Sequence, residues 1–311
     1  MKPSPKLPAS FLGGDPFNQF RFLYRRELLW KLFDEEYCLS VMKAAYDAGG
    51  RGFDLSFDVN SRLFKRLIET TGDRSLIGLG NPSWEQGVVF EQRFIQYNRD
   101  RILKTLVDRL FPRDLAARVE NQFSHDDVLV FGYDRNVEPL TDKEIESIYL
   151  DEVLFKQRIS IFKDCQYIAL GGSDADWLVS LGRLDIIQQM AQIVRQAGSI
   201  PFLLCQYASH IVPIVEDNHI DVEGYVIPLN RDWAWFDRDA CVEIVHSIQK
   251  PVIAFMPFAS GNLRQDIRGA LDWLYQDAGV ESILYGTADP QHAHSTTILA
   301  EQSRSAIQQD R

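Results

Sequence analysis

The segment Ile200–Tyr207 reads IPFLLCQY, and three further apolar segments follow it at similar intervals: VEGYVIPLN (222–230), PVIAFMPF (251–258) and ESILYGT (281–287). Stretches with the apolar spacing of helices separate them. This alternation predicts parallel strands joined by helices. Each segment ends in polar or small residues, and ligand sites of parallel α/β folds lie at the carboxyl ends of the strands.

The first two thirds of the chain add shorter predicted strands, at 11–14, 51–57, 75–81 and 167–172. Eight strands with helices between them predict an α/β fold, a closed (β/α)₈ TIM barrel that spans all 311 residues as a single domain. An open, doubly wound sheet is the alternative, because the first strand is short.

Residues 83–165 interrupt the alternation, and we expect a helical insertion after the third strand. A helix is predicted over Gln86–Leu110 and another over Leu115–Phe123, while 128–134 has the pattern of a strand. Thr141 and Glu144 have the spacing of a capping box, which predicts a helix from Asp142 to about Phe162.

The formal net charge of −11 disfavours nucleic acid and anionic membrane surfaces as partners. The four cysteines are widely spaced and no CxxC motif occurs, so the sequence indicates neither a zinc knuckle nor a dithiol site. No apolar run approaches the roughly 20 residues that span a bilayer. We expect a cytoplasmic protein with free thiols, no metal site and a small-molecule substrate. The oligomeric state is left open.

Three segments, taken in order, resemble the aldo-keto reductase superfamily. They are AYDAGGRGFD (45–54), KPVIAFMPFASG (250–261) and GVESILYGTADPQH (279–292). The resemblance implies a (β/α)₈ barrel and a carbonyl reductase that uses NADPH. It also implies four catalytic residues on successive strands: an Asp, a proton-donating Tyr, a Lys and a His.

Only one of these four positions matches. Asp54 occupies the Asp position, whereas Val59 stands where the resemblance implies the Tyr. The third strand ends in Gly80-Asn81 instead of Lys, and the fourth ends in Gly171-Gly172 instead of His. General acid catalysis by a tyrosine is therefore not available at the expected place.

The cofactor side of the resemblance is also incomplete. Phe255 stands where the family places an aromatic ring under the nicotinamide, and it could equally be a core residue. Gly286, Thr287 and Asp289 could form a phosphate-binding turn at a helix N-terminus. Residues 291–297 contain no Lys or Arg for a 2′-phosphate. NADP is kept only as an alternative, and the cofactor is otherwise unknown.

Other residues at strand ends are candidates for the site. Asp54 could act as an acid or base, and Asp15 could share its site. His210 could activate Cys205, although Cys205 could equally be a small core residue. The remaining candidates are expected to bind substrate, Arg231 as an anion clamp. They are Asn81, Gln206, Asn230, Arg231, Trp233 and Trp235.

Three functional hypotheses follow. The first is a barrel enzyme acting on a small polar or anionic substrate by a reaction other than NADPH-dependent carbonyl reduction, with Asp54, Asp15 and His210 as catalytic candidates. The second is a nicotinamide-dependent oxidoreductase with a displaced proton donor, Tyr133 or Tyr207. The third is a non-catalytic protein that binds a ligand or a partner through residues 83–165.

Overall fold

The computed structural model describes residues 6–17, 31–82, 86–124, 134, 136–232 and 237–310. Within them, eight parallel strands form a closed barrel in the order β1-β11-β10-β9-β8-β7-β3-β2. The predicted barrel is therefore confirmed, and the open sheet is wrong. The barrel strands are β1 (Ser10–Leu12), β2 (Gly52–Leu55), β3 (Ile77–Gly80), β7 (Tyr167–Gly171), β8 (Ile200–Leu204), β9 (Gly224–Pro228), β10 (Val252–Phe255) and β11 (Ser282–Tyr285).

The barrel interior is filled by alternate residues of the strands, because successive side chains of a strand point to opposite faces. The rings of Tyr167 and Phe202 meet edge to face, with their centroids 5.1 Å apart. The buried members of this interior cluster are Leu7, Phe11, Leu79, Tyr167, Ala169, Phe202, Leu204, Val226 and Ile253.

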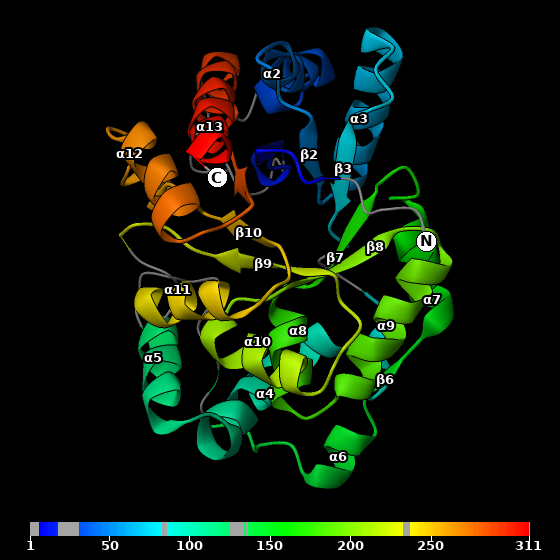
Figure 1. The fold of residues 1–311 in the computed structure, drawn as a ribbon. Helices are drawn as coiled ribbons and strands as arrows, with labels where there is room; N and C mark the ends of the chain where they lie inside the picture. The colour runs from blue at the N-terminus through cyan, green and yellow to red at the C-terminus, as the bar shows by residue number, and fades with distance from the viewer. Residues whose placement is uncertain are drawn as a thin grey trace.

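Helices surround the strands as an outer layer (Figure 1). Their apolar faces repeat at helical spacing; Ile187, Ala191 and Val194, for example, are fully buried. Helices α13 and α2 lie side by side next to β1, so the end of the chain covers its beginning. The outer helices are α2 (Glu35–Asp47), α3 (Asp58–Thr71), α8 (Ser173–Ser180), α9 (Leu184–Gln196), α10 (Ala208–Asp217), α11 (Arg238–Ser247), α12 (Ile267–Asp272) and α13 (Pro290–Asp310).

The insertion is more varied than its sequence indicates. Strands β4 (Val88–Phe90), β5 (Arg93–Phe94) and β6 (Tyr149–Leu150) form a small antiparallel sheet in the order β5-β4-β6. The prediction of one helix over 86–110 is wrong in its first part. Glu91 and Gln92 both adopt positive φ (50° and 60°), and this turn folds β4 and β5 into a hairpin.

The helical parts of the insertion follow the hairpin. They are α4 (Arg99–Thr105), a π-helical turn (Leu106–Leu110), α5 (Arg113–Ser124), α6 (Asp142–Glu146) and α7 (Glu152–Ser160). Helix α5 confirms the prediction over 115–123. Most of the strand predicted at 128–134 lies outside the described residues.

The capping box of α6 is present, since Thr141 N donates to Glu144 Oε2 at 2.7 Å and Glu144 N donates to Thr141 Oγ1 at 3.3 Å. The predicted continuation to Phe162 is wrong. Pairing of β6 with β4 interrupts the helix, and Asp151 caps a separate helix, α7.

Gln86 joins the insertion to the barrel. Its Nε2 donates to the Gly171 carbonyl at 2.7 Å, and its Oε1 accepts from Gly171 N at 3.1 Å. Gly171 ends β7 with a φ of 99°, and a Cβ there would lie 2.1 Å from the Cβ of Ala175. The insertion therefore begins directly against the carboxyl end of β7. In the described part of the chain, no helix is both long and apolar enough to cross a membrane.

Replacing Gln86 by Leu should leave the N–H and C=O of Gly171 buried without partners, at a cost of about 2–4 kcal/mol in the free energy of unfolding. Urea denaturation followed by circular dichroism measures this change. Gln157→Leu is the matched control on the exposed surface of α7, and it should change stability by less than about 0.5 kcal/mol. Equal effects of the two substitutions would contradict the role given to Gln86.

Candidate functional site

Asp54 lies near the carboxyl end of β2 and is 4% exposed. Its neighbours Phe53 and Leu55 pack into the helix layer, so the alternation of the strand places Asp54 on the opposite face. Asp54 Oδ2 accepts hydrogen bonds from Gly14 N and from Ser56 Oγ, each at 2.9 Å. The other oxygen, Oδ1, is buried and has no partner among the described residues.

Burial, with a smaller contribution from the nearby carboxylate of Asp15, raises the pKa of Asp54 to about 7. The hydrogen bonds from Gly14 and Ser56 act in the opposite direction, because they stabilise the charged form. Asp15 begins a short 3₁₀ helix (Asp15–Phe17) directly after Gly14. The structure thus brings the two carboxylates within electrostatic range, and Asp54 exchanges its proton near neutral pH.

The loop that carries Gly14 is held by α3. Asn60 Nδ2 donates to the Gly14 carbonyl at 3.3 Å, and Asn60 Oδ1 accepts from Phe57 N at 3.0 Å. A Cβ on Gly14 would lie 2.7 Å from the carbonyl oxygen of Asp54, so only glycine allows this close approach. The position of Asp54 Oδ2 is therefore fixed by Gly14 N, whose loop Asn60 holds, and by Ser56 Oγ.

Two predicted substrate-binding residues present further unsatisfied acceptors. Asn81 follows β3 and Gln206 follows β8, and Asn81 Oδ1 and Gln206 Oε1 are buried without a partner in the described part of the chain. Strands β2, β3, β7 and β8 are consecutive in the ring, so Asp54, Asn81 and Gln206 come from one arc of the barrel mouth. This arc offers acceptors to a ligand that carries donors.

Two buried carboxylates on the same arc were missed by the sequence analysis. Asp174 and Asp176 lie in the first turn of α8, and burial raises their pKa values to about 7 and about 8. Asp176 Oδ2 accepts from Gln206 N at 2.8 Å, and Asp176 Oδ1 accepts from Tyr207 N at 3.1 Å. Gln96 of the insertion hydrogen-bonds Asp174. Asp176 thus positions the loop that carries Gln206.

The sequence does contain a pattern that indicates these two carboxylates. Asp174 and Asp176 lie two and four residues after the Gly171-Gly172 pair at the end of a predicted strand. Acidic residues in the first turn of a helix at a strand end are candidates for site residues.

The predicted anion clamp has an acidic partner within the protein. Arg231 Nη1 lies 2.7 Å from Asp266 Oδ2, so the guanidinium joins the loop after β9 to the segment before α12. The side chain of Asn230 is fully buried, and its Nδ2 donates to the Met256 carbonyl at 3.1 Å. Both residues connect the loops after β9 and β10. Trp233 and Trp235 lie outside the described residues.

Tyr207 and His210 lie against the insertion, and Cys205 is a buried residue directly after β8. Phe111 contacts the rings of Tyr207 and His210 edge to face, at centroid distances of 5.7 and 5.5 Å. Burial lowers the pKa of His210, and it raises the pKa values of Cys205 and Tyr207 well above their usual ranges. All three groups are therefore neutral near pH 7. Tyr133, the other proposed proton donor, lies outside the described residues.

The turn before α13 does not fit the phosphates of a dinucleotide. Asp289 Oδ1 accepts from Gln291 N at 2.8 Å and from His292 N at 3.0 Å, and Thr287 Oγ1 accepts from Asp289 N at 3.1 Å. The donors that would bind an anion therefore already bind a carboxylate, which repels phosphate. A Cβ on Gly286 would lie 2.9 Å from the side chain of Pro16, so the turn packs closely against the short 3₁₀ helix Asp15–Phe17.

At the mouth end of β10, Phe255 is half-buried against the interior cluster of the barrel. The Phe255 ring can therefore contact both the barrel core and a ligand at the barrel mouth. Within the ranges that the structure describes, no group of three or more His, Cys, Asp or Glu side chains could hold a metal ion.

Comparison with known proteins gives a likeness in structure alone. No family model matches the chain, and no curated protein matches its sequence. A protein of Pseudomonas aeruginosa described as an aldo-keto reductase has a similar structure, with a TM-score of 0.55 and 12% identity over 95% of this chain and 90% of that one. A thermostable aldo-keto reductase solved with the inhibitor epalrestat gives a TM-score of 0.54 and 12% identity over 97% and 95%. The chain therefore has the (β/α)₈ fold seen in aldo-keto reductases.

The protonation of Asp54 should appear in the stability of the protein. Its carboxyl has an unfolded-state pKa near 4 and a folded-state pKa of about 7. Above pH 4 the unfolded chain loses this proton first, so the contribution of Asp54 to stability falls as the pH rises from 4 to 7 and is constant above. The fall should be about 4 kcal/mol. Urea unfolding of wild type and Asp54→Asn across this range measures it as their difference.

Asp217→Asn, at the exposed end of α10, serves as the control for this comparison, and it should leave the pH dependence of stability unchanged. A constant stability difference between wild type and Asp54→Asn from pH 4 to pH 8 would show that Asp54 is ionised throughout.

Proposed function

We propose that the protein is a barrel enzyme that transfers a proton to or from a small polar substrate at the mouth of the barrel, with Asp54 as general acid and base. The observation that carries the proposal is the state of the Asp54 carboxyl. It combines a pKa of about 7 with a buried oxygen, Oδ1, that has no hydrogen-bond partner among the described groups. A carboxyl group with these properties can both give and take a proton at neutral pH.

The two carboxyl oxygens have different roles. Gly14 N and Ser56 Oγ both donate to Oδ2, so that oxygen is best suited to remain an acceptor in either protonation state. The proton is then carried by Oδ1, the oxygen that has no hydrogen-bond partner among the described groups. Proton transfer by a positioned side chain contributes roughly 10²- to 10⁴-fold to a reaction rate.

The surroundings of Asp54 favour a neutral or cationic substrate with hydroxyl or amine donors. Asn81 Oδ1 and Gln206 Oε1 can each accept a hydrogen bond from such a group. An anionic substrate, the other possibility from the sequence, would face the carboxylate of Asp15, while Arg231 is already paired with Asp266. We therefore place polyols, sugars and amino alcohols first among substrate classes.

This proposal requires no nicotinamide. If the carboxylate of Asp289 blocks the N-terminus of α13, NADPH should not bind. We expect titration with NADPH to millimolar concentration to leave the fluorescence of the six tryptophans unchanged after correction for absorbance. Saturable quenching would instead support the reductase alternative with a displaced proton donor.

Turnover by the Asp54→Asn variant tests the catalytic role. Thermal-shift screening of polyols, sugars and amino alcohols identifies the ligand, and its conversion is followed by NMR. The variant should bind this ligand with little change and lose about 10²- to 10⁴-fold in kcat, because Asn keeps the acceptor oxygen and lacks the proton. Binding without turnover by the wild type would support the non-catalytic alternative.

Asn81→Ala and Gln206→Ala should each weaken ligand binding about tenfold, because each removes one hydrogen-bond acceptor from the site. Asn218→Ala, at the exposed end of α10, is the control and should leave affinity unchanged. Isothermal titration with the screened ligand measures all three. Unaltered affinity in both Asn81→Ala and Gln206→Ala would remove the proposed substrate-binding arc.

A further inference from the structure

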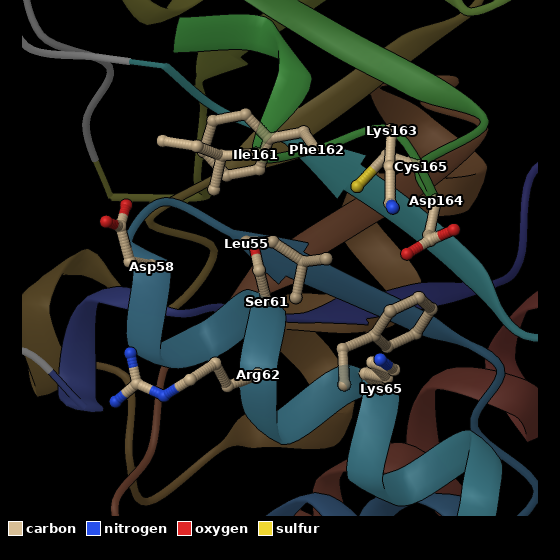
Figure 2. Close-up of a pocket in the computed structure, with 11 residues that line it drawn as sticks. Leu55, Asp58, Ser61, Arg62, Lys65, Ile161, Phe162, Lys163, Asp164 and Cys165 are labelled. Atoms are coloured by element: carbon tan, nitrogen blue, oxygen red, sulfur yellow. The ribbon is translucent and has the colours of Figure 1, made fainter. Parts of the chain in front are cut away.

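A cavity lies on the outer wall of the barrel. It is formed between α3 and the turn Ile161–Cys165 that leads into β7, and its volume is about 360 Å³ (Figure 2). This is the size of a small-molecule site.

On the outer face of β3 the two residues are glycines, Gly78 and Gly80, and the shape of the cavity depends on them. A Cβ on Gly80 would lie 2.7 Å from the Cβ of Phe162, and one on Gly78 would lie 2.9 Å from the Sγ of Cys165. The turn therefore packs directly on the backbone of β3. The insertion takes the place of the short helical connection that would otherwise follow this strand, and an opening remains between the turn and α3.

The floor of the cavity is apolar. Leu55, Phe64 and Phe162 are each 1% exposed in the structure as a whole, and all three line the opening. Burial raises the pKa of the Cys165 thiol far above its usual range, so this lining residue is neutral and unreactive. A ligand would be held here by apolar contact and not by a covalent bond.

The rim carries charges of both signs, and one of its two acidic residues is already paired. Asp58 lies 3.2 Å from Arg158, and Arg62 lies 2.9 Å from Glu35. Lys65 and Lys163 are exposed and form no ion pair with any residue that the structure describes. Figure 2 shows both of them at the edge of the opening.

Asp164 is the one acidic lining residue that forms no ion pair with a residue in the described ranges, so unpaired lysines outnumber it by two to one. This local excess of positive charge occurs on a chain whose net charge is −11. Ser61 Oγ, also in the lining, is buried and without a hydrogen-bond partner in the described part of the protein.

We propose that this cavity binds a small organic anion with an apolar body, such as an aromatic or aliphatic carboxylate or sulfonate. The apolar body contacts Leu55, Phe64 and Phe162, and the anionic group lies between Lys65 and Lys163. The Ser61 hydroxyl donates to a polar atom of the ligand. The cavity and the Asp54 site lie on opposite faces of β2, so this inference is independent of the proposed function.

Fluorescence titration with anilinonaphthalene sulfonate, an aromatic sulfonate, tests the site, and the neutral phenylnaphthylamine is its uncharged analogue. We expect saturable binding of the sulfonate and weaker binding of the amine. The double variant Lys65→Gln/Lys163→Gln should bind the sulfonate about tenfold more weakly and bind the amine unchanged. Lys6→Gln/Lys143→Gln removes two exposed lysines elsewhere and should keep wild-type affinity for both probes.

A second variant tests the cavity itself. Ser61→Leu adds apolar volume inside the opening and should reduce binding of both probes, with folding checked by circular dichroism. The proposal is overturned if the sulfonate does not bind saturably, or if it binds the Lys65/Lys163 double variant as tightly as the wild type. It is equally overturned if the Lys6/Lys143 control loses the same affinity.

Discussion

The hydrogen bond from Gly14 N to Asp54 Oδ2 joins the shortest strand of the barrel to the candidate site, and the position of the buried carboxyl depends on it. Strand β1 has three residues, and its ladder to β11 ends when Gly13 N donates to the Tyr285 carbonyl at 2.7 Å. The next N–H, that of Gly14, binds the side chain of Asp54 on β2 instead. The backbone ladders of β1 to β11 and to β2 are thus extended by one contact with a carboxyl group. That carboxyl needs a partner because burial makes an unpaired acidic group costly, so the end of β1 and the position of the acid stabilise each other.

The barrel could be predicted from sequence because its information is local and repeated. Each strand is a short apolar run ended by glycine or polar residues, and all eight were found in the expected order. The secondary structure of the insertion is harder to predict, because Val88–Phe90 has an apolar pattern compatible with either a helix or a strand. The choice is made by the turn at Glu91-Gln92 and by pairing with Tyr149, about sixty residues away in the chain. Neither feature can be read from periodicity.

The candidate site was predictable where position along a strand is sufficient. The candidates Asp54 and Asp15 could be predicted from the ends of their strands, whereas the contacts of Asp176 with Gln206 N and Tyr207 N join segments about thirty residues apart in the chain. The role of Arg231 depends on Asp266, which lies 35 residues further along the chain. Such a pairing depends on the three-dimensional arrangement of the loops after β9 and β10, and it cannot be predicted from the spacing of the two residues in the sequence.

The same residue type can serve a different purpose when its neighbours change. The resemblance implies a lysine at the end of the third strand, and a cation near a carboxylate stabilises the charged form of that carboxylate. Here Asn81 occupies that end of β3, and Asp15 adds a negative charge instead. Burial is then opposed only by the two hydrogen bonds to Oδ2, and the pKa of Asp54 rises to about 7. Without a cation at this position, burial leaves Asp54 with a carboxyl group that can carry a proton near neutral pH, which supports the acid–base role proposed for it.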